Sequence, residues 1–343
     1  MVHIKSEKMV VPDDISIINR LFYEKGWSDG LPIIPPTAER VRELLRGTRR
    51  KPDEVIGFIP PKWAGATVEK IAINAVMAGC FPEHMPIIIG VVQAMLQRQF
   101  NLYSVQTTTH PCGPLLIING PIRRTLGINC DYGVFGPGTL ANATIGRAIR
   151  LILINVGGAI PGKVDKATHG HPGKFSYAIG EHEEKSPWNS LSVERGFNAE
   201  ESTITVVAAE SPHNINDNCS ISAEGILTTI AGTLACQGNN NVIFQIGEPL
   251  VVLGPEHAAS IAKEGFSKED VKEFLFEKTR IPKRAFSKEL QELRFSNLSD
   301  GAMIPVTRKA DDILIVVAGG AGKHSMIIPT FGNSFAVTEA IEN

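Results

Sequence analysis

The sequence predicts an α/β fold with mixed or parallel sheets, built from strand-glycine-helix units and preceded by an N-terminal helical arm. Short, apolar, β-branched runs that stop at glycine are typical of buried strands in such sheets. Three runs of this kind occur: PLLIINGP at residues 114–121, PLVVLGP at 249–255 and ILIVVAGG at 313–320. In the first two, proline follows the glycine and suits the first turn of a helix, so each predicts a strand that leads directly into a helix.

The likeness of the first two runs predicts two similar lobes. We expect an N-terminal part at residues 1–60, with helices and a proline-rich arm, and an α/β body at 61–343 with lobes 61–200 and 201–343. Matches this short also arise by chance, which leaves one undivided body as the alternative. A chain of 343 residues is long enough for one large or two medium domains.

Capping and stop residues mark the expected helices. Asp14 and Gly26 bound the first, Thr37 and Gly47 bound the second, and a third runs from Thr67 to Gly79. Residues 27–36, WSDGLPIIPP, contain glycine and three prolines and predict an extended, wrapping arm. The remaining periodic runs predict helices at 82–97, 140–156, 223–236, 258–264 and 268–279, strands near 175–179 and 203–208, and a peripheral helix and linker within 283–308.

Composition excludes several classes of protein. The 34 Lys and Arg nearly balance the 36 Asp and Glu, so no overall positive field attracts nucleic acid. The most apolar segments are shorter than the roughly 20 residues of a membrane-spanning helix. The first eight residues, MVHIKSEK, lack the order of a signal peptide, so we expect a cytoplasmic protein with no membrane contact. Its five cysteines are scattered and never spaced C-x-x-C, which predicts reduced thiols.

The first candidate catalytic pair is His110 and Cys112, in the polar run QTTTHPCGP before a predicted strand. An imidazole two residues from a thiol can serve as the base for a thiolate nucleophile, or both can ligate a metal. A hydrogen-bonded turn histidine beside a small buried thiol is the structural alternative.

Two glycine-rich turns are candidate anion-binding sites. In the first, residues 127–147, backbone amides at a helix N-terminus can hold a phosphate or carboxylate, with Asn142, Thr144 and Arg147 as further donors. The second, GGAGKHS at 319–325, offers Lys323 beside backbone amides, although it is not a P-loop. Packed or solvated turns without a ligand are the alternative for both.

Three histidines form the best metal candidate by ligand count: His169, His171 and His182, with nearby carboxylates. Imidazole and carboxylate are common ligands of divalent transition metals. A solvated acidic run at residues 181–185 is the alternative.

The run ESPHNINDNC at residues 210–219 follows a predicted strand and concentrates an acid, an imidazole, amides and a thiol. Strand ends are where α/β proteins place ligand groups, so His213 and Asp217 are the favoured half-site. An Asx-rich helix cap explains Asp217 equally well, but it does not explain His213.

With these residues in view, the chain resembles the UGSC-type (seleno)protein family, named for a redox Sec-Gly-Ser-Cys motif. The resemblance covers residues 27 to about 280 and rests on DGLPIIPPT, ATVEKIAINAVMAGC, TTH, NATIGR and HNIND, which begin at residues 29, 66, 108, 142 and 213. This chain has no Cys-Gly-Ser-Cys or other C-x-x-C element. The resemblance therefore implies that the redox motif is on a partner protein and that this chain is the larger, substrate-binding subunit.

Together these features favour an enzyme or enzyme subunit that acts on a small anionic molecule by thiol-dependent redox or lyase chemistry. In this hypothesis His110, His213 and Asp217 are acids, bases or ligands, Cys112 or Cys80 is the thiol, and Arg147 and Lys323 hold the anion. A metal-dependent hydrolase, hydratase or lyase and a non-catalytic scaffold subunit remain open. The apolar arm at 27–36 predicts a homo- or hetero-oligomer.

Overall fold

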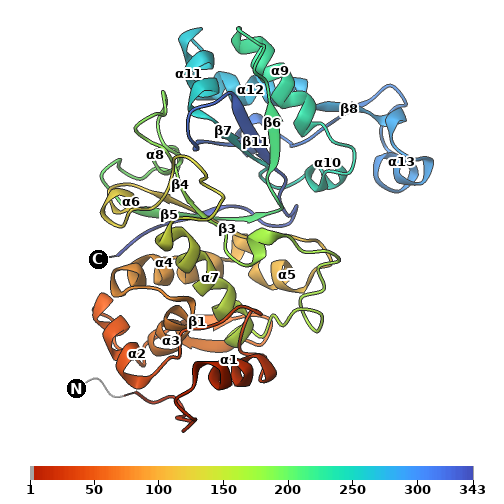
Figure 1. Cartoon of the computed structure of the whole chain (residues 1–343). Helices are drawn as coiled ribbons and strands as arrows, with labels where there is room; N and C mark the ends of the chain where they lie inside the picture. The colour runs from red at the N-terminus through yellow and green to blue at the C-terminus, as the bar shows by residue number, and fades with distance from the viewer. Residues whose placement is uncertain (1–3, 343) are drawn as a thin grey trace.

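Four layers, in the order helices, sheet, sheet, helices, make up the computed structural model of the chain (Figure 1). The structure describes residues 4–342. Residues 1–3 and residue 343 lie outside the described part. The prediction about a signal peptide concerns residues 1–8, so it falls partly on residues outside the described part. The predicted mixed α/β fold with an N-terminal helix is confirmed.

The helices and strands have the following bounds, given in chain order. The α-helices are α1 (Ile15–Glu24), α2 (Ala38–Leu44), α3 (Val68–Ala78), α4 (Met85–Leu96), α5 (Leu102–Thr107), α6 (Ile122–Thr125), α7 (Leu140–Asn155), α8 (Leu191–Glu194), α9 (Ala223–Leu234), α10 (Asn240–Phe244), α11 (Pro255–Lys263), α12 (Lys268–Lys278) and α13 (Lys288–Phe295). The strands are β1 (Val55–Ile59), β2 (Ala64–Thr67), β3 (Gly113–Asn119), β4 (Ala178–Gly180), β5 (Thr203–Ala209), β6 (His213–Asn216), β7 (Leu250–Leu253), β8 (Arg280–Pro282), β9 (Met303–Pro305), β10 (Leu314–Val317), β11 (His324–Ile328) and β12 (Val337–Ala340).

The two central sheets have the same arrangement of strands. In the first, of order β12-β5-β3-β4, β3 is parallel to β4 and antiparallel to β5, which is antiparallel to β12. In the second, of order β10-β7-β11-β6, β7 is parallel to β10 and antiparallel to β11, which is antiparallel to β6. The similar runs of the sequence are β3 and β7, which therefore occupy equivalent positions.

The last strand of each half is exchanged between the sheets. After β5 in the first sheet, the chain crosses to form β6 at the edge of the second sheet. After β11 in the second sheet, it crosses back to form β12 at the edge of the first. β5 and β12 of the first sheet and all four strands of the second sheet lie after residue 200, so a boundary at that position divides the first sheet and does not separate the two sheets.

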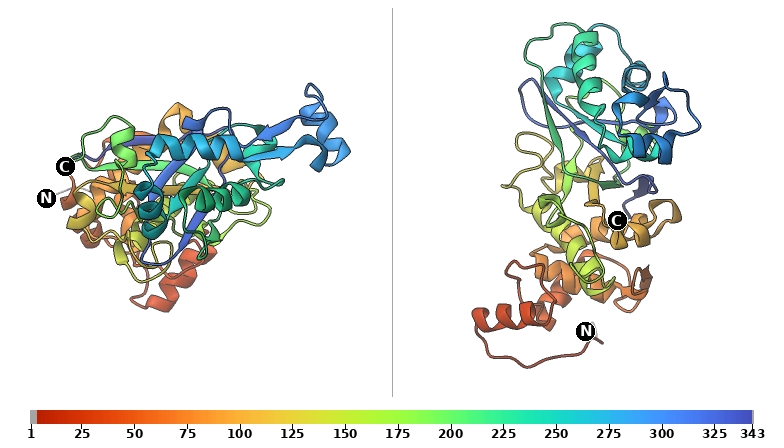
Figure 2. Two further views of the ribbon diagram at one scale, coloured as in Figure 1. Left: turned by 90° about the horizontal axis from the view of Figure 1, so that it is seen from above. Right: turned by 90° about the vertical axis from the view of Figure 1, so that its right-hand side faces the viewer.

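Side chains alternate between three apolar layers, as the pleat of a strand requires. On β3, Leu116 and Ile118 face α3, α4 and α7, while Leu115 and Ile117 face the second sheet. On β7, Leu250 and Val252 meet them in the layer between the sheets. The opposite face of the second sheet packs on α9, α11 and α12, which lie at the far end of the molecule from the N-terminal helices (Figure 2).

The N-terminal segment packs on its own chain. Ile33 in the proline-rich arm is buried, and the Ile34 amide donates to the Met77 carbonyl of α3. Residues 4–60 are thus part of the first helical layer through Val41 and Leu44 of α2. Within residues 4–342, no helix combines the length and apolar composition needed to cross a bilayer.

Candidate active site

The antiparallel pairing of β3 with β5 brings together residues a hundred positions apart. Gly113, the first residue of β3, pairs with Ala209, the last residue of β5. His110 precedes β3 and Glu210 follows β5, so both lie at the same end of the sheet. His110 Nε2 lies 2.6 Å from Glu210 Oε1, with 14% and 25% of the two side chains exposed.

The imidazole of His110 has one nitrogen engaged and one available. Glu210, as a carboxylate, accepts a hydrogen bond from Nε2, which leaves Nδ1 as the unprotonated nitrogen of a neutral ring. Nδ1 is buried and makes no hydrogen bond within the described part of the chain. This arrangement is that of a general base held in orientation by a carboxylate.

Two buried cations lie beside this dyad and share one carboxylate. Lys174 Nζ lies 2.7 Å from Asp165, and the Arg150 guanidinium lies 3.8 Å from the same carboxylate. Arg150 Nε donates to the Lys174 carbonyl at 2.7 Å, but Arg150 Nη1 makes no hydrogen bond to any residue within 4–342. Because a buried polar group requires a partner, Arg150 Nη1 is the donor in this cluster that an added anion would satisfy.

His171 completes the wall of this region as a neutral ring. Burial, reinforced by the neighbouring Lys174 ammonium, lowers the pKa of His171 to about 4. Its Nδ1 accepts from the Gly173 amide, so the proton is on Nε2, a buried donor that faces the Ala209 backbone without a well-formed hydrogen bond in the described residues. A side chain in place of Gly113 would contact Lys174 at 3.4 Å and His171 Nε2 at 3.9 Å, which shows how closely these groups surround the start of β3.

The thiol of Cys112 belongs to the same cluster but is not a resting thiolate. Burial raises the pKa of Cys112 to about 12, and the nearby Lys174 ammonium does not offset it. We call the whole cluster the His110 site; it consists of His110, Cys112, Arg150, Asp165, His171, Lys174 and Glu210.

Cys80, the other predicted thiol, lies elsewhere. It follows α3 in the helical layer, next to Thr144 and Arg147, and burial raises its pKa to about 12. Within residues 4–342 its electrostatic neighbours, Thr144 and Arg147, lie on α7 and not in the His110 site.

Of the predicted anion donors, Asn142 and Arg147 have structural partners, whereas the buried Thr144 hydroxyl lies beside the Cys80 thiol, away from the His110 site. Asn142 accepts from the Asn129 amide and donates to the Asn129 and Ala178 carbonyls. Arg147 forms a two-point ion pair with Asp29, and its guanidinium also donates to arm carbonyls. At Lys323, the neighbouring Gly322 amide donates to Glu256, so this backbone donor is already occupied.

The favoured half-site at residues 210–219 contributes only its first residue, Glu210. His213 begins the edge strand β6, and its side chain is exposed. Asp217 is a structural cap: it accepts from the Cys219 and Ser220 amides and from the Thr229 hydroxyl. Although burial alone would raise its pKa, these hydrogen bonds lower the pKa of Asp217 to about 2.

The three predicted metal-binding histidines lie in different surroundings. His169 is exposed in its loop, His171 lines the His110 site, and His182 lies with Cys130 and Glu184. Among residues 4–342, this last trio is the one group of at least three potential ligands whose ligand atoms all lie within 4.8 Å of one another.

Several members of the His110 site were not among the predicted site residues. Arg150 lies within an apolar helix, where an isolated arginine was an available signal of a buried charge. Asp165, Lys174 and Glu210 were within runs noted for their polarity, but their convergence depends on the β3–β5 pairing.

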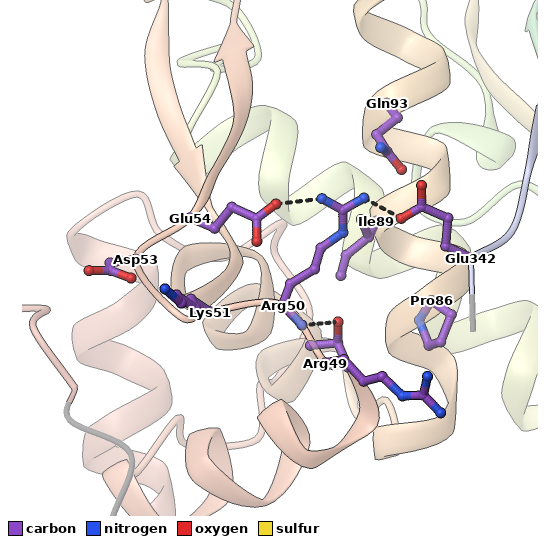
Figure 3. A pocket seen from close by; sticks show the side chains of 10 residues that line it. Arg49, Arg50, Lys51, Asp53, Glu54, Pro86, Ile89, Gln93 and Glu342 are labelled. Atoms are coloured by element: carbon purple, nitrogen blue, oxygen red, sulfur yellow. Dashed lines mark hydrogen bonds and ion pairs between the residues drawn. The ribbon is translucent and has the colours of Figure 1, made fainter.

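A pocket of about 840 Å³ lies away from all these residues, between the segment before β1, α4 and the C-terminal segment. Figure 3 shows the Arg50 guanidinium pointing between the carboxylates of Glu54 and Glu342. Arg50, the central cation of this pocket, is already paired with two carboxylates, so the pocket is a weaker candidate for binding an anion than the His110 site.

Comparison of the chain with models of known families, and with curated proteins, finds no match to either.

Proposed function

We propose that the chain is an enzyme that acts on a small anionic molecule by acid–base chemistry of the lyase type at the His110 site. The observation that carries the proposal is the placement of two buried cations, Arg150 and Lys174, beside the His110–Glu210 dyad. Lyases that act on carboxylates or phosphate esters need a base for a proton near the anion and cations that hold the charge.

In this proposal each group has one role. Arg150 Nη1 and Lys174 hold the anionic group of the substrate, which gives Nη1 the partner that it lacks among the described residues. His110 Nδ1 takes a proton from the substrate, and Glu210 stabilises the imidazolium that forms. His171 Nε2 donates a hydrogen bond to the substrate.

The thiol-dependent alternative is less well supported by the geometry. A nucleophilic or redox role for Cys112 requires loss of its proton, and burial raises its pKa to about 12. The resemblance to the UGSC-type family, with a redox motif on a partner protein, still supports a thiol role, so Cys112→Ser is the variant that separates the two proposals. Full activity in Cys112→Ser supports the acid–base proposal, and its loss supports the thiol role.

The test is a panel of small carboxylates and phosphate esters incubated with the protein in D2O and followed by NMR for deuterium uptake, addition or elimination. Loss of a general base costs about 10²- to 10⁴-fold in rate, so His110→Gln should lower turnover by that factor. Glu210→Gln, which removes the carboxylate that orients the base and stabilises the imidazolium, should lower turnover as well. Lys174→Gln should weaken binding of the anion, whereas Lys166→Gln, an exposed lysine of the same loop, is the matched control.

Binding is measured independently by the shift in melting temperature that each anion causes. A wild-type protein that none of the anions stabilises, or Glu210→Gln and Lys174→Gln variants that equal the Lys166→Gln control in both assays, would contradict the proposal.

A further inference from the structure

A second polar cluster lies at the other end of β3, where strands of both sheets finish. Cys130 and His182 are each fixed by their backbone to the end of β10: the Gly319 amide donates to the Cys130 carbonyl at 2.9 Å, and the His182 amide donates to the Val317 carbonyl at 2.7 Å. A side chain at Gly180, the last residue of β4, would lie 3.2 Å from the Cys130 Cβ atom. β4 runs parallel to β3, and β10 runs parallel to β7. The carboxyl ends of parallel strands are a usual place for ligands in α/β proteins.

The side chains gathered there are those that bind transition metals. One atom each from Cys130, His182 and Glu184 lies within 4.8 Å of the other two. Zinc bonds of about 2.0 to 2.3 Å place tetrahedral ligands roughly 3.3 to 3.8 Å apart. The three groups therefore need to approach by only about 1 Å to surround an ion, and Glu184, which is 42% exposed, has room to move.

The imidazole of His182 is buried, with a carboxylate near each ring nitrogen. Its side chain is 10% exposed, and its Nδ1 atom makes no hydrogen bond within residues 4–342. Nδ1 lies 3.5 Å from Glu184 Oε2, while Asp131 lies 3.7 Å from Nε2 on the other side of the ring. A carboxylate behind the second nitrogen is the usual means of orienting a metal-binding histidine.

The surrounding charges are compatible with one added cation. Arg123 pairs with both Glu183 and Glu184 and lies 3.6 Å from the Cys130 sulfur; Lys185 pairs with Asp131. If Glu184 turns toward an ion, Arg123 keeps Glu183 as its partner at 2.8 Å. The three carboxylates and the thiolate then balance Arg123, Lys185 and a divalent ion, while Arg124, which also lies 3.5 Å from Glu184, is 68% exposed to solvent.

We propose that Cys130, His182 and Glu184 bind one divalent transition-metal ion of the zinc type, with Asp131 as the carboxylate that orients His182. Water fills the fourth position, as in zinc sites with three protein ligands. The site is independent of the His110 site, and its test uses no turnover.

The test titrates the full chain, freed of metal with a chelator that is then removed, with Co²⁺ as a spectroscopic substitute for zinc. One equivalent should bind and produce a thiolate-to-cobalt charge-transfer band. In Cys130→Ser the band should vanish, and His182→Gln should bind Zn²⁺ more weakly by more than the roughly 100-fold effect of an outer-shell change. Asp131→Asn should weaken binding by about 10- to 100-fold.

The matched controls are Cys236→Ser and His169→Gln, because both residues are exposed and lie outside the cluster. Circular dichroism melts of the metal-free variants check folding; where Cys130→Ser or His182→Gln is unfolded, Glu184→Gln at the surface takes its place. Failure of the wild-type chain to take up stoichiometric cobalt, or a charge-transfer band that persists in Cys130→Ser and is lost in Cys236→Ser, would overturn the proposal.

Discussion

Ala209 and Thr330 form an isolated antiparallel bridge at the point where the two halves of the chain exchange strands. Beside it, the Glu210 amide donates to the Pro329 carbonyl at 2.9 Å. The crossing also places Phe331 against the His110 ring, with the two ring centres 5.5 Å apart. The His110 site is thus built from residues between 110 and 210 but is supported by residues 329–331, which return from the second sheet.

The equivalent positions of β3 and β7 place a glycine after each strand in close contact with the backbone of the neighbouring strand, which leads to the first prediction. A Cβ atom at Gly120, after β3, would lie 2.2 Å from the Glu201 carbonyl oxygen, just before β5. A Cβ atom at Gly254, after β7, would lie 2.1 Å from the His324 carbonyl oxygen, where β11 begins. Gly254→Ala should therefore lower the free energy of unfolding by about 1 to 3 kcal/mol in urea titrations.

Gly120→Ala should cost about 1 to 2 kcal/mol more than Gly254→Ala, because its φ of +81° also disfavours a side chain. Gly232→Ala is the control: it lies within α9 with nothing near its Cβ position, and it should stabilise by about 0.5 to 1 kcal/mol. Equal stabilities for the three variants would refute the close approach of these backbones.

The helices and the central strands could be predicted from local sequence. Asp14, Thr37 and Thr67 cap α1, α2 and α3 as expected, and Gly79 ends α3 with a φ of +91°. The apolar runs at β3, β7 and β10 could be recognised because a strand buried on both faces has a continuous run of hydrophobic residues.

The exchanged strands could not be predicted because their pattern is set by tertiary contacts. Three of the four residues of β6, HNIN, are exposed, so this edge strand has no apolar alternation to read. The third strand-glycine run leads into β11 rather than a helix. For the His110 site, His110 and Cys112 were found from local polarity, whereas Glu210 was assigned its partner only by the β3–β5 register.

A second prediction concerns the reactivity of the thiols. Cys219 and Cys236 are exposed, Cys130 is partly exposed, and Cys80 and Cys112 are buried with pKa values raised by burial to about 12. A thiol reagent at neutral pH should modify two thiols rapidly, a third slowly and all five only after unfolding, because the thiolate is the reacting form. Rapid modification of a buried thiol, in a Cys219→Ser/Cys236→Ser double variant, would instead restore a thiol role for Cys112.

A third prediction follows from the neutral His171. Its pKa is about 4 in the folded protein and close to 6.5 when unfolded, so the unfolded state binds the extra proton between these values. The free energy of unfolding should therefore fall as the pH is lowered from about 6.5 to about 4, with no further contribution from His171 below that range. His171→Gln should flatten this part of the profile, measured by urea unfolding at several pH values.

His169→Gln is the matched control for this prediction, since His169 is two residues away and exposed. Its profile should follow that of the wild type. A His171→Gln profile as steep as the control would show that His171 is not held neutral.

The last prediction concerns the ion pair that fixes the proline-rich arm. Arg147 contacts Asp29 at 2.8 and 2.9 Å, and the Asp29 side chain is only 2% exposed. Arg147→Met leaves this carboxylate buried without its cation, which should cost about 3 to 5 kcal/mol in the free energy of unfolding. The arm should also become a site of rapid proteolysis within residues 27–36, because its carbonyls lose their hydrogen bonds to the same guanidinium.

Arg46→Met is the control, because it removes an exposed pair with Glu43 and should lower the free energy of unfolding by no more than about 1 kcal/mol. If both variants lose the same small amount and the arm stays resistant, then the apolar contact of Ile33, rather than the ion pair, holds the arm in place.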